Sequence, residues 1–244
     1  MIKVSNLYKS FGKVQAVRGI SFAARDGEVT GLLGPNGAGK TTTLRMLYSL
    51  LPPDAGEIEV DGLNPIRDAL AIKRNLGVVP DNRGLYNRLT ARENIRYFGE
   101  LHGMSHDSIR ERLEDFARRL NMADFMDRRC EGFSQGQRVK VAIARAMVHQ
   151  PRTVLLDEPS NGLDVMSTRE LRKYILTLKG AGHCIVLSTH IMQEVAALCD
   201  RIVIIAGGVI AAEGTPPALL ARTGRASLED AFVDLIGTDE GLLA

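Results

Sequence analysis

One glycine-rich stretch limits the fold of this chain more than any other feature. Residues 34–41 read GPNGAGKT and fit the pattern G-x-x-x-x-G-K-[ST]. The apolar segment EVTGLL precedes the stretch, and TTTLRMLYSL follows it with helical periodicity. In a chain of 244 residues of average composition, such a match has a probability on the order of one in a hundred. Strand, loop and helix in this order predict a phosphate-binding loop. The alternative is a glycine-rich turn that binds nothing.

The residue types of this loop suit a nucleotide with Mg²⁺. Glycines let the backbone turn its N–H groups toward phosphate oxygens, and the N-terminus of the following helix adds positive potential. Lys40 can reach the β- and γ-phosphates, and the Thr41 hydroxyl can bind Mg²⁺.

Two carboxylates and a histidine follow apolar strands later in the chain. VLLDE places Asp157 at a strand end, where it can bind Mg²⁺, and Glu158 next to it, where it can deprotonate a water. Taken alone, the pair could be solvated acids, but the preceding phosphate loop favours the catalytic interpretation. His190 follows CIVLST and can contact the γ-phosphate, although a lone histidine is more often structural.

The pattern of elements predicts a mostly parallel sheet covered on both faces by helices. TVLLD, HCIVLS and RIVIIA read as strands, and STRELRKYILTLK and IMQEVAALC read as the helices between them. From about Thr90 to Gln150 the chain reads as a helical insert, with Ser105 and Ser134 as N-caps. The tail from about Pro216 reads as two short helices.

The segment FSQGQ opens an apolar helix within this insert. A helix N-terminus with Ser134 and the small Gly136 makes an anion site. Because the chain already has a phosphate loop, a second anion site suits a second phosphate contact. The alternative is that Ser134 only caps a core helix, and both roles are compatible.

Composition excludes some functions. The net charge of +2, from 31 basic and 29 acidic side chains, gives no electrostatic case for nucleic acid as a partner. The three cysteines are irregularly spaced and indicate neither a disulfide framework nor a zinc site. The longest apolar run, residues 202–212, is shorter than the ~20 residues of a membrane span. A membrane function therefore needs a second chain.

The segments GPNGAGKTT, FSQGQ, LLDEPSNGLD and STH, in this order, resemble the ATP-binding subunit of an ABC transporter over nearly the whole chain. GVVPDNRGLYNRLTARENI and SLEDAFVDLIG are most similar to the ABC-2 export group, which includes sodium-extruding and drug-extruding members. The resemblance implies an α/β fold with a P-loop NTPase (RecA-like) core, an N-terminal antiparallel β subdomain and an inserted α-helical subdomain. It also implies a single domain over 1–244, with the core at 1–89 and 150–215, the helical signature subdomain at 90–149 and a helical tail at 216–244.

The resemblance also assigns site residues. In this family two subunits pack head to tail, so the signature segment of one faces the ATP of the other. The signature residues here are Ser134, Gln135, Gly136 and Gln137, with Gln135 in place of the usual glycine and Phe133 in place of leucine. The ATP-binding residues are Phe11, Gly34, Pro35, Asn36, Gly37, Ala38, Gly39, Lys40, Thr41 and Thr42.

The remaining roles follow the same resemblance. Glu158 and His190 are the catalytic residues, Thr41 and Asp157 hold the metal, and Asp164 lines the subunit interface. Phe11 would stack on adenine, with core packing as the alternative. Asp81 stands where the family has glutamine, and whether it coordinates metal or lies nearby stays open.

The implied activity is ATP hydrolysis, with ATP and Mg²⁺ as cofactors, by a subunit that powers a membrane exporter. The implied partners are a second copy of the chain, or a related one, and a separate multi-helix membrane permease. The implied location is the cytoplasmic face of the cell membrane. Sodium ion is the first candidate substrate, and a drug, a lipid or a polysaccharide is the alternative. A non-transport ABC ATPase and an ATP-binding regulatory module that does not hydrolyse are the competing functions.

Overall fold

The computed structural model describes residues 1–237 and contains two β-sheets. A three-stranded sheet has the order β2-β1-β4, and a six-stranded sheet has the order β5-β6-β7-β3-β8-β9. The strands are β1 (Ile2–Phe11), β2 (Val14–Ala24), β3 (Val29–Leu33), β4 (Ala55–Val60), β5 (Leu76–Val79), β6 (Thr153–Asp157), β7 (Cys184–Thr189), β8 (Arg201–Ala206) and β9 (Val209–Gly214).

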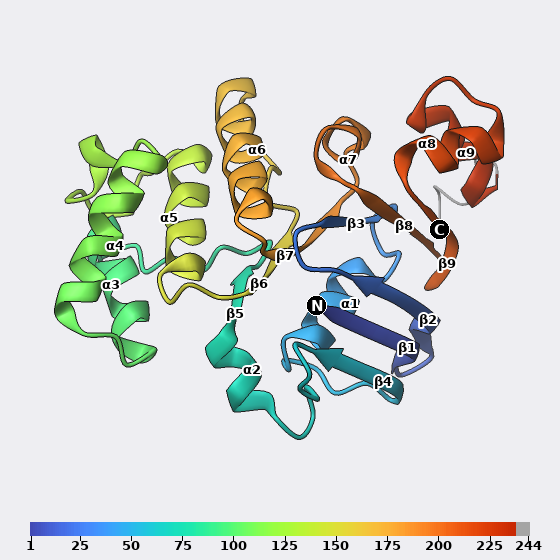
Figure 1. Cartoon of the computed structure of the whole chain (residues 1–244), viewed down its shortest axis with the longest axis horizontal. Helices are drawn as coiled ribbons and strands as arrows, with labels where there is room; N and C mark the ends of the chain where they lie inside the picture. The colour runs from blue at the N-terminus through green and yellow to red at the C-terminus, as the bar shows by residue number, and fades with distance from the viewer. Residues whose placement is uncertain (238–244) are drawn as a thin grey trace.

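The helices gather at both ends of the molecule and beside the larger sheet (Figure 1). The group α3, α4 and α5 lies at one end of the view, and α8 and α9 lie at the other. The helices are α1 (Lys40–Leu47), α2 (Ala69–Asn75), α3 (Ala91–Leu101), α4 (His106–Arg119), α5 (Gln135–Met147), α6 (Val165–Gly180), α7 (Met192–Leu198), α8 (Pro216–Thr223) and α9 (Leu228–Ile236), with a 3₁₀ turn at Ala123–Phe125.

The larger sheet is parallel from β5 to β8, as the alternating strands and helices predicted. Every residue of β3, β6 and β7 is buried, which explains why these strands are mostly apolar, while Asp157, Ser188 and Thr189 are buried polar residues at the strand ends. In the register, Leu33 pairs with Thr189 and Asp157 pairs with Ser188. The carboxyl ends of the three strands therefore lie at one edge, where ligands bind in open α/β sheets.

The smaller sheet is antiparallel, since β1 pairs with β2 on one side and β4 on the other. Its inward side chains, such as Ile2 and Leu7, share one hydrophobic cluster with Leu44 of α1 and Leu155 of β6. This packing fixes the smaller sheet against the core that carries α1.

The segment between β5 and β6 contains the helices of the predicted insert. Ser105 and Ser134 are the N-caps of α4 and α5, and each side chain accepts a hydrogen bond from a backbone N–H in the first turn. Both N-cap predictions are confirmed. Phe116 of α4 and Val141 of α5 belong to the same hydrophobic cluster as the larger sheet. The division into subdomains at residues 90 and 149 remains a prediction.

Some elements differ from the expectation. The helix α6 begins at Val165, before the expected start at Ser167, because Asp164 caps it. The tail forms the two expected helices, α8 and α9, while residues 238–244 of the predicted tail lie outside the described part. Within residues 1–237, no helix combines the length and the apolar character that crossing a membrane requires.

Candidate functional site

The phosphate loop lies between β3 and α1, and its shape requires glycine. Gly37 has φ 82° and Gly39 has φ 104°, a region that side chains disfavour. A Cβ at Gly39 would lie 2.4 Å from the Ala16 carbonyl oxygen, and one at Gly34 would lie 2.1 Å from the Ile205 carbonyl oxygen. The loop is therefore packed against the main chain of β2 and β8.

A cavity of about 510 Å³ opens over this loop. Its lining includes the whole stretch 36–42 and residues that follow three other strands. Those residues are Asp81 after β5, Glu158 and Asn161 after β6, and His190 after β7. The structure thus brings most of the predicted nucleotide-binding and catalytic residues to one cavity.

Lys40 is held at this cavity by the loop itself. Its Nζ donates hydrogen bonds to the carbonyl oxygens of Gly34 at 2.7 Å and Pro35 at 3.0 Å. The same atom lies 3.4 Å from Glu158 Oε1, and the Lys40 side chain is only 6% exposed. These three oxygens partner an ammonium that burial would otherwise destabilise. Gly34 and Pro35 serve the site through their carbonyls, although they are outside the cavity lining.

Asp157 and Thr41 form an oxygen cluster beside Lys40. Thr41 Oγ1 donates to Asp157 Oδ1 at 3.1 Å, and Ser188 Oγ donates to the same oxygen. Burial raises the pKa of Asp157, the bonds from Ser188 and Thr41 oppose this, and the charges of Glu158 and Asp81 raise it further. A cation at this point would relieve that repulsion, so the donor set fits Mg²⁺, which takes few protein ligands beside water and phosphate. Residues 1–237 contain no group of three or more His, Cys, Asp or Glu side chains placed to hold a metal by themselves.

Glu158 lies between two nitrogen groups. His190 Nδ1 is 2.9 Å from Glu158 Oε2, while Lys40 approaches Oε1. The backbone of Glu158 has φ 45°, and its N–H donates to the Ser188 carbonyl at 3.1 Å. The carboxylate is 11% exposed, so its direction is set by these contacts. A base held in this way at the cavity wall is suited to accept a proton from a bound water.

The signature segment (Ser134–Gln137) is not part of the cavity lining. Ser134 and Gln137 form a capping box, in which Ser134 Oγ accepts from the Gln137 N–H and Gln137 Oε1 accepts from the Ser134 N–H. A Cβ on Gly136 would lie 2.4 Å from Ser167 Oγ of α6. The segment therefore has a local structural role and is separate from the cavity over the chain's own phosphate loop.

Phe11 and Asp164 also lie outside the cavity lining. Phe11 ends β1 and is 48% exposed, which removes core packing as an explanation for it. Its role toward adenine stays a prediction. Asp164 caps α6 and accepts from the Ser167 N–H at 2.8 Å, and this bond and one from the Ser167 hydroxyl lower its pKa.

Sequence reasoning missed several residues of the site. Ser188 binds Asp157, Asn161 lines the cavity, and Arg83 donates to Gln135 and to the Asn161 carbonyl. Asn161 follows Glu158 closely in the chain, which was an available signal. Arg83 and Ser188 act through contacts between separate segments, which no spacing in the sequence reveals.

The fold and the cavity define a nucleotide-binding protein of the P-loop ATPase class. The chain belongs to the ABC transporter family, whose model matches residues 17–161. It is 48% identical over 202 residues to the ABC transporter ATP-binding protein NatA of Bacillus subtilis (strain 168), a match covering 82% of each chain.

Further comparisons agree with this membership. The linearmycin resistance ATP-binding protein LnrL of Bacillus subtilis (strain 168) is 36% identical over 224 residues, covering 92% of this chain and 72% of LnrL. The dimeric structure of MJ0796, a bacterial ABC transporter cassette, superposes with a TM-score of 0.81 at 26% identity, covering 88% of this chain and 98% of the cassette. The predicted family and fold class are confirmed.

Proposed function

We propose that this chain is the ATP-hydrolysing subunit of a membrane exporter and that it works as a dimer with ATP held between the two copies. The observation that carries the proposal is that Lys40, Thr41, Glu158 and His190 line one cavity, with Asp157 hydrogen-bonded to Thr41 behind the lining. Cation, metal ligands and base are the groups that phosphoryl transfer to water requires.

Each residue has a distinct task in this reaction. The N–H groups of the loop and Lys40 bind the β- and γ-phosphates. Thr41 and Asp157 would hold Mg²⁺, which supplies charge neutralisation on the phosphate oxygens. Glu158 accepts a proton from water as the water oxygen bonds to the γ-phosphorus, and the bridging oxygen leaves with ADP. His190 orients the Glu158 carboxylate and supports the transferring group.

The second copy supplies the signature segment. Ser134 Oγ accepts from the Gln137 N–H, so its hydroxyl hydrogen can still be donated to a phosphate. The N-terminus of α5 adds positive potential at the same point. Because this anion site is separate from the chain's own cavity, a γ-phosphate bound by the partner is the ligand that suits it. Asp164, at the start of α6, would lie at this interface.

The exporter assignment rests on the family and on its relatives. LnrL is named for resistance to linearmycin, and export of such a compound is one candidate activity for this chain. Sodium ion stays the first candidate from the sequence resemblance. A permease with several membrane helices would bind this chain at the cytoplasmic face of the membrane. Co-fractionation with such a chain separates this function from that of an ABC ATPase outside transport.

The proposal is tested by the mass of the Glu158→Gln variant in solution, with and without ATP and Mg²⁺. We expect a shift from monomer to dimer on addition of ATP, because bound ATP joins the two copies when hydrolysis is blocked. Adding Ser134→Arg should abolish the shift while ATP binding persists, whereas Lys40→Ala should abolish both. A variant that binds ATP and stays monomeric, also with the membrane partner present, contradicts the shared site.

A further inference from the structure

We propose that Arg83 is a positioning residue that fixes the signature segment of its own chain relative to its own nucleotide cavity. Through this link, each chain would set how its Ser134 is presented to the ATP of the partner. The inference rests on the shared nucleotide site proposed above. Arg83 itself does not line the cavity.

One guanidinium connects three segments. Arg83 Nη1 donates to Gln135 Oε1 in the signature segment at 2.5 Å. Arg83 Nη2 donates to the Asn161 carbonyl at 3.0 Å and faces the Pro159 carbonyl at 3.4 Å. Asn161 lines the cavity, and so does Asp81, two residues before Arg83. The chain's nucleotide cavity and its signature segment are thus joined by a single side chain.

The backbone that carries Arg83 is itself held against α5. Arg145 of α5 donates to the Arg83 carbonyl at 2.5 Å and to the Gly84 carbonyl at 2.8 Å. The Arg145 guanidinium also lies 4.5 Å from the centre of the Phe98 ring. Arg145 is 7% exposed, and burial lowers its pKa, so its hydrogen bonds are made in a largely dry environment. Arg83 is therefore anchored on α5 through its main chain as well as through Gln135.

The chemistry of the link explains the unusual residue in the signature segment. Gln135 stands where the family usually has glycine, and glycine would offer no side-chain acceptor to Arg83. A planar guanidinium can donate to Gln135 and to Asn161 at the same time, which a lysine ammonium on its flexible stem does poorly. Movement of residues 159–161 must therefore break the Arg83 bonds or displace Gln135.

Mixed dimers test the direction of this link. One copy carries Lys40→Ala, so that turnover occurs at the intact loop of the other copy and uses the signature segment of the Lys40→Ala copy. Arg83→Ala is then placed on one copy or on the other, and the dimers are isolated by two different affinity tags. We expect Arg83→Ala on the signature-donating copy to lower kcat by about tenfold with little change in the KM for ATP. The inference is overturned if kcat falls only when Arg83→Ala is on the copy with the intact loop, or if kcat falls in neither dimer.

A double-mutant cycle tests the contact itself in homodimers. Gln135→Ala should lower kcat less than Arg83→Ala, because Arg83→Ala also removes the bond to the Asn161 carbonyl. The two changes together should lower kcat no further than Arg83→Ala alone, because both remove the same Arg83–Gln135 hydrogen bond. Arg83→Lys should restore only part of the activity. Arg88→Ala is the matched control, since Arg88 is exposed in the same segment. Additive losses in the cycle count against the Arg83–Gln135 contact.

Failure of this inference can be told from failure of the proposed function. Suppose that Glu158→Gln protein dimerises with ATP, but kcat of the Arg83→Ala dimers equals that of the Arg88→Ala control. Then only the role of Arg83 is contradicted. If Glu158→Gln protein never dimerises, the shared nucleotide site is contradicted, whatever the Arg83 variants do. Urea unfolding of Arg83→Ala and Gln135→Ala shows whether each variant is folded. If Arg83→Ala is unfolded, the same mixed-dimer test is made with Gln135→Ala.

Discussion

At the scale of single residues, the contacts of Glu158 set its chemistry. Lys40 lies 3.4 Å from one carboxylate oxygen, and His190 Nδ1 lies 2.9 Å from the other. Both contacts hold the carboxylate at the wall of the cavity. The position of the proposed base is thus controlled by groups that also belong to the nucleotide cavity.

We expect Glu158→Gln to lower ATP turnover by about a hundredfold or more, because an amide cannot accept the proton of the attacking water. ATP affinity should change little, since Lys40 and the loop N–H groups remain. Single-turnover phosphate release and nucleotide binding measure the two effects separately. Glu57→Gln, on the exposed part of β4, is the control. Equal turnover by variant and wild type would exclude Glu158 as the base.

His149 lies in a second cavity, between the helical segment and the core, where its ring stacks on that of His102 with 3.6 Å between centroids. Burial, followed by the charge of His102, lowers the pKa of His149 from an ordinary 6.5 to about 4. Burial lowers the pKa of His102 as well. Both rings therefore favour the neutral form in the folded chain.

This pair predicts a loss of stability in acid. Below about pH 6.5 the unfolded chain takes up a proton that folded His149 resists, so the free energy of unfolding should fall as the pH decreases toward about 4. His149→Phe should flatten this slope while keeping a ring against His102. Urea unfolding across this pH range measures it, with exposed His106→Phe as the control. An unchanged slope in His149→Phe would refute the assignment.

The residues that line the nucleotide cavity were largely predictable from the sequence, because the spacing in GPNGAGKT and the positions of Glu158 and His190 after strands are local signals. The Arg83–Gln135 contact was not, because it joins residues from separate segments whose approach depends on the packing of α5. Phe11 illustrates the same limit. An aromatic side chain at this position is evident from the sequence, but its exposure at the end of β1 depends on the tertiary structure.

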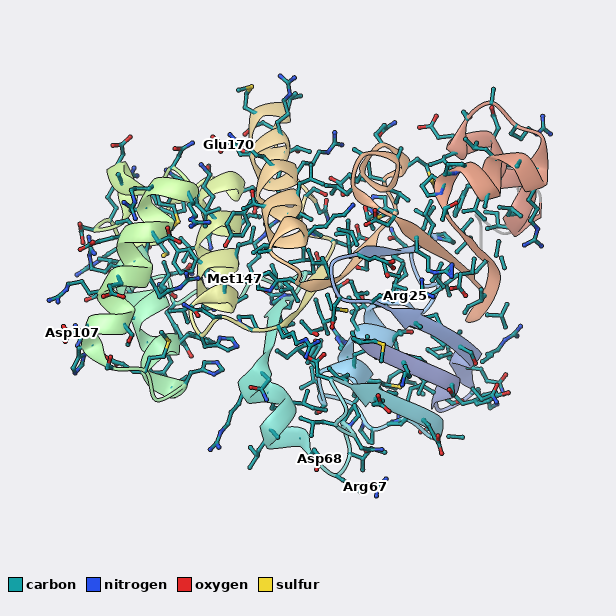
Figure 2. The ribbon with its side chains drawn as sticks, viewed as in Figure 1. Arg25, Arg67, Asp68, Asp107, Met147 and Glu170 are labelled. Carbon is teal, nitrogen blue, oxygen red and sulfur yellow. The ribbon has the colours of Figure 1, made fainter. Side chains whose placement is uncertain are left out.

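At the scale of elements, the contact between α5 and α6 determines where the signature segment lies. Gly136 allows a close approach to Ser167, and Lys140 of α5 pairs with Glu170 of α6 at 2.7 Å. Figure 2 shows Glu170 on the side of α6 that faces α5. The two helices therefore fix the start of α5 beside the cap of α6.

We expect Gly136→Ala to lower the free energy of unfolding by about 1–3 kcal/mol, because the new Cβ overlaps Ser167 Oγ. Adding Ser167→Ala removes the nearer atom and should recover part of the loss. Gly180→Ala is the matched control, since a Cβ there meets nothing within 4 Å. Denaturant unfolding measures all three variants. Equal effects at Gly136 and Gly180 would show that helix propensity, rather than packing, determines the change.

Some elements could not be predicted. The short helix α2 buries only Ile72, so its sequence has little amphipathic signal. The caps of α4 and α5 were predicted because serine at an N-cap is a local signal, whereas the cap of α6, Asp164, was predicted only as an interface residue.

At the scale of the whole molecule, the tail belongs to the same core as the larger sheet. Phe232 of α9 is 6% exposed and shares a hydrophobic cluster with Val195 of α7 and Ile204 of β8. The sequence predicted two helices here, but it gave no indication of what they pack against. The order of the strands in the sheet could likewise not be predicted from the sequence, because pairing between distant strands leaves no local pattern.

We expect Phe232→Ala to lower the free energy of unfolding of the whole chain by about 3–5 kcal/mol in a single transition, since the lost contacts belong to the main core. Val233→Ala, at a side chain that is 40% exposed, should have a much smaller effect. Thermal unfolding followed by two probes distinguishes one transition from two. An early separate transition in Phe232→Ala would show that the tail folds independently.

The packing behind the phosphate loop has a consequence for how this chain can diverge. The atoms nearest to Cβ positions at Gly34 and Gly39 are the carbonyl oxygens of Ile205 and Ala16, which every amino acid possesses. Exposed side chains on β2 can therefore be exchanged over evolution without reshaping the nucleotide cavity, provided that the strand keeps its course. Exposed residues of this chain can therefore change over evolution while the main-chain walls of the ATP-binding loop stay the same.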